Sequence, residues 1–145
     1  MSHLVLVDTS VWLFALGDRP IAEIRDQVQS LVENNLAATN VAIMYELLSF
    51  TMAAGQRTQL TDYLSALHLF PLSHRDWMAA ALWMATLRSK DIKLKSMDAL
   101  IAYTALQNDA TLLHADSDFD KFCPAAEVRS QSCVTLAQKY SKKKR

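Results

Sequence analysis

Short apolar runs alternate with longer helical patterns along the whole sequence. The first run, residues 4–7, is Leu-Val-Leu-Val and stops at Asp8-Thr9-Ser10, which predicts a buried strand followed directly by a helix. By the same reasoning, further strands are expected at residues 36–39, 69–72 and 111–114, and near Val128. Apolar residues at helical spacing and capping residues predict helices over residues 11–16, 20–32, 41–54, 58–67, 73–87 and 97–106.

The resulting order is β-α-α-β-α-α-β-α-α-β-α-β, with a tight acidic turn after residues 111–114. Strands that alternate with helices indicate a parallel sheet covered on both faces. We therefore predict an α/β fold in three layers, α/β/α, with a short central parallel sheet. A chain of 145 residues suits one domain. We assign it residues 1–137 and expect residues 138–145 to be a solvated basic tail.

Several classes of protein are excluded by composition. No apolar run approaches the ~20 residues that a membrane span needs, and the first residues do not have the pattern of a secretory signal, so we expect a cytoplasmic protein with no membrane partner. The two cysteines, Cys123 and Cys133, fit neither a zinc site nor a disulfide scaffold. The glycine-rich loops of dinucleotide and P-loop proteins are absent.

The formal net charge of zero hides an uneven distribution. Residues 1–138 hold ten basic and fifteen acidic residues, a net charge of −5, and five basic residues follow. An acidic body is unusual for a protein that binds nucleic acid non-specifically. If this chain binds nucleic acid, something must neutralise its own carboxylates, and metal ions would do so.

Four carboxylates are placed where a site is expected. In an open parallel sheet, ligands bind beyond the carboxyl ends of the strands, and Asp8 and Asp116 follow two of the predicted strands. Glu46 and Asp98 lie in otherwise apolar helices. Taken singly, Asp8 could cap a helix, Asp98 could complement a helix dipole, and Glu46 could face solvent. As a group, they would need a cation to offset their repulsion, and oxygen ligands alone favour Mg²⁺ or Mn²⁺ over zinc.

Four segments in order resemble the signatures of the PIN domain family, in particular VapC-type toxins: residues 7–12, 46–47, 98–102 and 113–119. The resemblance extends over about residues 4 to 136. It implies an Mg²⁺- or Mn²⁺-dependent endoribonuclease that cleaves RNA phosphodiesters by metal-activated water. Its catalytic residues would be Asp8, Glu46, Asp98 and Asp116, with Asp8, Asp98 and Asp116 holding the metal and Glu46 orienting or deprotonating the water.

The resemblance also implies roles for neighbouring residues and for partners. Ser10 would be a hydroxyl close to the metal, and Asp118 matches a second acid whose role varies in the family. His114 replaces a common threonine, and residues 108–110 lack a usual glycine. The implied partners are an RNA substrate, a small VapB-type antitoxin and a second copy of the chain in a homodimer.

Two further surfaces follow from the residues themselves. A basic run precedes Asp98, and we expect it to contact RNA phosphates; it consists of Arg88, Lys90, Lys93 and Lys95. The apolar residues of segments 11–16 and 44–52 exceed what one helix face can bury. Trp12, Phe14 and Phe50 are therefore candidates either for the core or for a groove that takes an antitoxin segment.

The sequence also bears on functions other than a nuclease. Residues 116–127 imitate an EF-hand loop, but Lys121 stands where its glycine is required. A receiver-like phosphoacceptor domain would need paired acids after the first strand, and a phosphatase of the Asp-x-Asp type fails at Ser10. A catalytically inactive PIN-like interaction module is the remaining alternative, although such a module typically loses acids that this chain keeps.

Overall fold

The computed structural model describes residues 3–142, and its centre is a five-stranded, entirely parallel β-sheet. The strands lie in the order β3-β2-β1-β4-β5. They are short: β1 (Val5–Val7), β2 (Ala37–Thr39), β3 (His68–Leu69), β4 (Thr111–His114) and β5 (Ser130–Ser132). The predicted central parallel sheet is confirmed.

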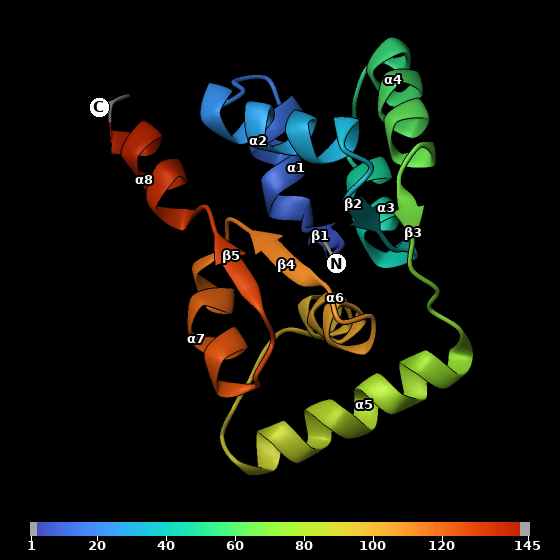
Figure 1. The fold of residues 1–145 in the computed structure, drawn as a ribbon, viewed down its shortest axis with the longest axis vertical. Helices are drawn as coiled ribbons and strands as arrows, with labels where there is room; N and C mark the ends of the chain where they lie inside the picture. Colours follow the sequence, from blue (N-terminus) through green and yellow to red (C-terminus); the bar gives the residue numbers. More distant parts are fainter. Residues whose placement is uncertain (1–2, 143–145) are drawn as a thin grey trace.

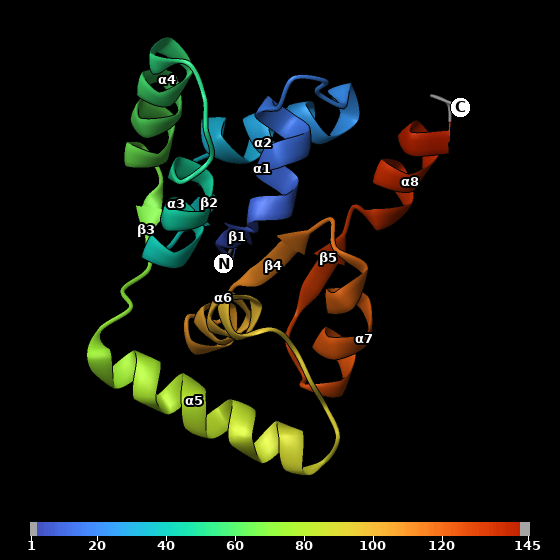
Figure 2. The ribbon, with the colours of Figure 1, turned by 180° about the vertical axis from the view of Figure 1, so that it is seen from behind.

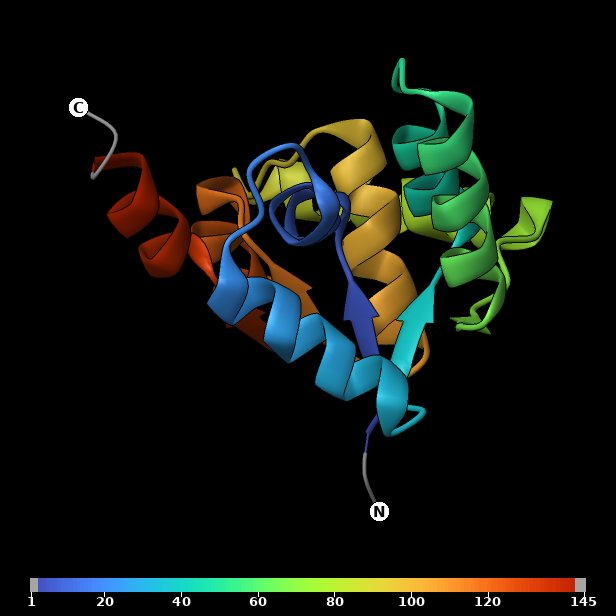
Figure 3. The same ribbon diagram turned by 90° about the horizontal axis from the view of Figure 1, so that it is seen from above.

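Eight helices flank this sheet and complete the predicted α/β/α layers. Figures 1 and 3 show α1 and α2 on one face of the sheet and α6 on the other, while Figure 2 shows α5 outside α6 and farther from the strands. The helices are α1 (Thr9–Leu16), α2 (Ala22–Glu33), α3 (Val41–Leu48), α4 (Ala54–Ser65), α5 (His74–Ser89), α6 (Ser96–Gln107), α7 (Ser117–Ala125) and α8 (Val134–Lys142). No helix in the described part of the chain is long and apolar enough to cross a membrane.

The pairing of β1 with β4 lies in the core. Leu6 lies opposite Leu112 and Val7 opposite Leu113, and all four side chains are fully buried. Strands buried on both faces are expected to be continuous apolar runs, and these two are. The chain passes from β1 to β2 on one side and later returns to β4 on the other, so the gap between β1 and β4 is a switch point at which ligands bind in such sheets.

One predicted helix, residues 41–54, is wrong in its second half. Helix α3 ends at Leu48, and Gly55 lies in the first turn of α4 instead of closing α3. The guanidinium of Arg57 donates hydrogen bonds to the backbone oxygens of Leu48 and Phe50. Because a side chain from the next helix satisfies the end of α3, no local capping signal marks it.

The helix expected between the fourth and fifth strands is present, but the tight acidic turn expected before it is not. Asp116 directly caps helix α7, its Oδ1 accepting a hydrogen bond from the backbone N of Asp118 at 2.9 Å. Residues 117–125 are helical, which excludes the EF-hand loop.

The expected boundary at Ala137 falls within helix α8. Tyr140 packs against the core and its hydroxyl donates a hydrogen bond to Glu23 on α2. The prediction that the chain is solvated after Ala137 is therefore wrong as far as Tyr140. Residues 143–145 lie outside the described residues, and the domain boundary stays a prediction.

Residues 108–110, just before β4, lack the usual glycine, and an aspartate adopts the backbone conformation that glycine favours. Asp109 has a φ of 51°, the left-handed conformation for which glycine is favoured after a helix. Its carboxylate accepts a hydrogen bond from Arg129 at 3.1 Å. Aspartate tolerates this conformation better than most residues, so α6 still ends where β4 requires it to.

Candidate metal centre

Asp8 is the most deeply buried of the predicted site residues. It follows β1 directly and caps α1, with Oδ2 accepting hydrogen bonds from the backbone N of Ser10 at 3.0 Å and from its Oγ at 2.5 Å. The residue is only 3% exposed, and Oδ1 is buried with no hydrogen-bond partner among the described residues. Burial raises the pKa of Asp8 to about 6, although the bonds from Ser10 favour the charged form. An unpartnered buried carboxylate oxygen of this kind fits a cation ligand.

Glu46 is connected to the same place through Thr9. The Thr9 hydroxyl donates a 2.7 Å hydrogen bond to Glu46 Oε1, joining the first turn of α1 to α3. Glu46 is partly exposed and its negative charge raises the pKa of Asp8. Asp8, which caps α1, and Glu46 on α3 are thus brought close together.

Asp98 lies in the first turn of α6, and the charges of all three other predicted acids affect its pKa. Its pKa is raised to about 7, first by burial and then by the negative charges of Asp8, Asp116 and Glu46. Lys95 opposes the shift. Four acids from α1, α3, α6 and the end of β4 therefore lie within electrostatic range of one another.

The tightest cluster of carboxylate oxygens includes Asp118. One oxygen each from Asp98, Asp116 and Asp118 lies within 4.8 Å of the other two. Oxygens bound to one octahedral Mg²⁺ are at most about 4.2 Å apart, so small side-chain movements would bring these three onto one ion. Asp8 does not belong to this three-oxygen group, and its charge acts on Asp98 from beside it.

Two hydrogen bonds that the sequence did not reveal hold the site together. Ser10 Oγ, besides donating to Asp8, accepts a hydrogen bond from the backbone N of Ala115 at 2.9 Å, which joins α1 to the end of β4. Asn40 Nδ2 donates to Thr104 Oγ1 at 3.0 Å in the core, joining the start of α3 to α6. The sequence alone gives no local signal for a contact between positions so far apart.

His114 supports the loop that holds Asp116. It is fully buried at the end of β4, and its Nδ1 accepts a hydrogen bond from the backbone N of Asp116 at 3.4 Å. Nε2 lies 3.7 Å from Asp120 Oδ1. Burial lowers the pKa of His114 and the charge of Asp120 opposes that shift, so the side chain acts as a neutral acceptor beneath the site.

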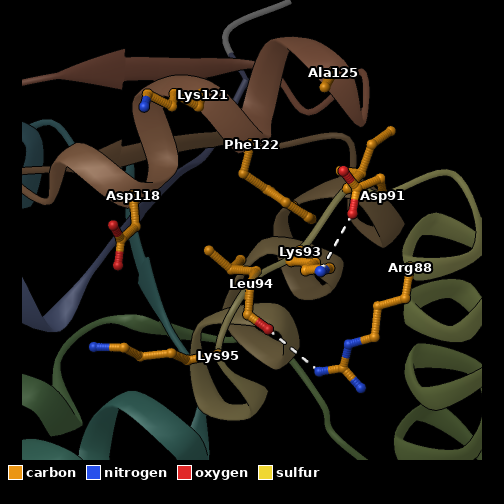
Figure 4. Close-up of a pocket in the computed structure, with 10 residues that line it drawn as sticks. Arg88, Asp91, Lys93, Leu94, Lys95, Asp118, Lys121, Phe122 and Ala125 are labelled. Atoms are coloured by element: carbon orange, nitrogen blue, oxygen red, sulfur yellow. Dashed lines mark hydrogen bonds and ion pairs between the residues drawn. The ribbon is translucent and has the colours of Figure 1, made fainter.

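The predicted basic run lies beside this carboxylate cluster, but not all of its residues line the same groove. Figure 4 shows an open groove between the segment 88–95 and helix α7, into which Asp118 projects. We call it the basic groove; its lining includes Arg88, Lys93, Lys95, Asp118, Lys121 and Phe122. Lys90, the second residue of the predicted run, does not line it.

The three apolar candidates separate in the structure. Trp12 is core, 1% exposed, and its indole Nε1 donates to the backbone oxygen of Val7 at 3.1 Å. Phe50 is 47% exposed and lines a second groove of about 260 Å³, which we call the apolar groove. Its other apolar lining residues are Trp12, Leu13, Leu16, Leu47, Met52, Leu60 and Tyr63. Phe14 lies outside it, packs against the core and lines a separate hollow with residues of α8.

The overall fold is shared with several toxin–antitoxin structures. A VapBC complex from Rickettsia felis bound to a promoter DNA fragment matches with a TM-score of 0.72 at 20% identity, over 89% of this chain and 98% of that one. DNA-bound VapBC from Salmonella typhimurium matches with a TM-score of 0.72 at 15% identity, over 90% and 98%. A toxin–antitoxin complex from Klebsiella pneumoniae matches with a TM-score of 0.63 at 22% identity, over 79% and 89%.

Sequence comparison gives the family. No curated protein sequence matches this one significantly. The family model of the PIN domain, however, matches residues 5–123, most of the chain and every one of the clustered acids. The chain belongs to the PIN domain family.

Proposed function

We propose that this protein is an Mg²⁺- or Mn²⁺-dependent endoribonuclease and the toxin of a VapBC-type toxin–antitoxin pair. The observation that carries the proposal is the convergence of Asp8, Glu46, Asp98 and Asp116 at the switch point of the sheet. Such mutual repulsion is costly unless protons or a cation compensate it. The toxin–antitoxin complexes with the same fold support the assignment to this class.

We assign the metal ligands to Asp8, Asp98 and Asp116, with Asp118 as a further ligand at the exposed side. All are hard oxygen donors, and Asp8 Oδ1 has no other partner among the described residues. A bound divalent ion would polarise the scissile phosphate and lower the pKa of a water molecule toward neutrality. Glu46, held by Thr9, is positioned to orient that water or accept its proton.

The antitoxin is proposed to bind the apolar groove. Leu13 and Phe50 are 44% and 47% exposed, and the groove walls are mostly apolar, as expected for a site that takes an amphipathic helix or an extended apolar segment. An antitoxin arginine or lysine placed among the carboxylates would block the site as well. Other exposed apolar side chains, among them Tyr45, Met78 and Leu82, are available for a homodimer.

The test of the nuclease is the charge of Asp98. In Asp98→Asn the amide keeps the size of the side chain but not the ligand charge, so cleavage of total RNA in Mg²⁺ or Mn²⁺ should fall at least about 100-fold. Loss of a group that merely supports a ligand costs 10–100-fold. Chelator should abolish cleavage by the unaltered protein.

Asp62→Asn is the matched control, because Asp62 is an exposed acid on α4 with no part in the site. It should cleave as the unaltered protein does. Undiminished cleavage by Asp98→Asn, or full cleavage in excess chelator, would show that the metal-nuclease proposal is wrong.

A further inference from the structure

We propose that the basic groove binds the phosphates of the RNA strand next to the scissile bond, with Lys95 and Lys121 as its main contacts. This inference rests on the proposed nuclease function and adds to it the path of the substrate. The two lysines come from separate elements, Lys95 from the residue that precedes α6 and Lys121 from α7. A pattern read along the sequence would not pair them.

The first reason is position. Asp118 belongs both to the three-oxygen cluster and to the lining of the groove, so the two sites are continuous. The groove has a volume of about 690 Å³ and is open to solvent, with Asp118 and Lys95 at one end and Arg88 and Asp91 at the other (Figure 4). A strand with one phosphate at the acidic cluster would have its neighbouring phosphates along this groove.

The second reason is that the groove's cations are not equally available. Lys93 Nζ forms an ion pair with Asp91 at 3.2 Å, and Arg88 donates a hydrogen bond to the backbone oxygen of Leu94 at 3.3 Å. The side chains of Lys95 and Lys121 are exposed, and neither forms an ion pair or a side-chain hydrogen bond within residues 3–142. The charge of Lys95 acts on Asp98 without forming an ion pair, so both ammonium groups are available to contact phosphates.

The third reason is the lining of the groove. Its one aromatic residue among those described, Phe122, is only 2% exposed, so no ring is presented for a base to stack on. Cationic side chains without a stacking surface recognise the backbone and not the bases. The groove should therefore guide RNA to the acids with little preference for sequence.

The experiment measures RNA binding separately from cleavage. The parent protein carries Asp98→Asn, and its affinity for a fluorescein-labelled single-stranded RNA of mixed sequence is measured by anisotropy over a series of KCl concentrations. Lys95→Gln and Lys121→Gln are added singly and together. Lys90→Gln is the matched control, because Lys90 is an exposed lysine of the same run that does not line the groove.

The double variant should bind at least about fivefold more weakly, and each groove lysine that is removed should lower the slope of log K against log salt by about 0.7. Lys90→Gln should change neither. Unchanged melting temperatures would show that the variants are folded, as expected for exposed positions.

Three results overturn the inference. If the double variant and its parent bind RNA with equal affinity and equal salt dependence, the groove does not contact RNA. An equal loss in Lys90→Gln would show a general charge effect. Unaltered RNA binding with loss of antitoxin binding would make the groove a protein contact. In each case cleavage by the unaltered protein tests the nuclease proposal independently.

Discussion

Asp8 and Asp98 reach raised pKa values by different routes. Asp8 is affected mainly by its own burial, whereas Asp98, which is less buried, responds to burial and to three neighbouring acids. Both carboxyls hold protons more tightly in the folded protein than in the unfolded chain. Without metal, the site therefore favours folding when protonated and opposes it when ionised.

The contribution of these two acids to the stability of the metal-free protein should accordingly fall as pH rises. An acid whose pKa is raised on folding contributes stability below its unfolded value, here 3.8, and loses it as pH rises through the folded value, about 6 for Asp8 and about 7 for Asp98. For Asp8 the change is on the order of 3 kcal/mol. Urea unfolding of chelator-treated protein between pH 4 and pH 8, about the span of these values, would measure it.

Asp8→Asn should flatten this pH dependence. The amide oxygen can still cap α1, but the group no longer titrates. Asp62→Asn should keep the full dependence of the unaltered protein. An Asp8→Asn variant with the same pH dependence as the unaltered protein would contradict the raised pKa of Asp8.

The identity of the acids was within reach of the sequence, but their connections were not. Asp8 and Asp116 follow strands at once, and Asp98 interrupts an apolar helix, so each leaves a local signal. The bond from Thr9 to Glu46 and the bond from Ala115 to Ser10 join segments far apart in the chain. They exist only after the strands have paired, and the role of Asp118 in the oxygen cluster depends on the helix that begins at Ser117.

At the scale of elements, α3 and α6 are fixed to each other by one buried polar contact. Asn40 Oδ1 accepts a hydrogen bond from the backbone N of Ile43 at 2.8 Å, capping α3, and its Nδ2 bonds Thr104 on α6. These two helices hold Glu46 and Asp98. The pair thus sets the distance between two of the site's acids.

A double-mutant cycle should reveal this coupling. Thr104→Val leaves Asn40 Nδ2 buried without its partner, which should lower the free energy of unfolding by about 1–3 kcal/mol. Asn40→Ala removes the cap as well, for a further loss of about 1 kcal/mol. The double variant should be more stable than the sum of the two losses predicts.

Thermal or urea unfolding measures all three variants. Asn40→Asp keeps the cap acceptor but loses the Nδ2 donor, and it serves to separate capping from the contact with Thr104. Strict additivity of the two single substitutions would mean that the two residues do not interact.

Helix existence was easier to predict than helix ends. The order of strands and helices from β1 to β5 follows from apolar periodicity and is confirmed. The end of α3 was missed because it depends on Arg57, a side chain of the next helix. The whole of α8 was missed, because Tyr140 is held by Glu23, which is far away in the sequence on α2. The helix expected over residues 97–106 begins one residue earlier, at Ser96, and Lys95 precedes it without a side-chain cap.

For the whole molecule, the functions that we propose for the two grooves should be separable. Leu13→Asp or Phe50→Asp places a charge in the apolar groove, and we expect loss of the complex with the antitoxin encoded beside the gene while RNA cleavage persists. Co-purification and the RNA assay measure the two properties. Met78→Asp, a change at a more exposed apolar residue outside the groove, should keep the antitoxin and instead reports on dimerisation by light scattering.

Antitoxin binding that survives charges at both Leu13 and Phe50 would move the partner to another surface. Loss of cleavage in the same variants, with the fold intact, would mean that the apolar groove is part of the catalytic site. Neither result bears on the basic groove, which the RNA-binding experiment tests separately.

The pairing of β1 with β4 has a consequence for biosynthesis. Val5 pairs with Thr111 and Val7 with Leu113, so the second residue of the central pair is made long after the first. Contacts that span so much chain form late and slowly. Until residues 111–116 have left the ribosome, Asp8 has neither the strand that buries it nor the backbone of Ala115 that holds Ser10. A nascent chain therefore lacks the complete cluster of acids for most of its synthesis, and the antitoxin proposed above, if made at the same time, would be present when the site forms.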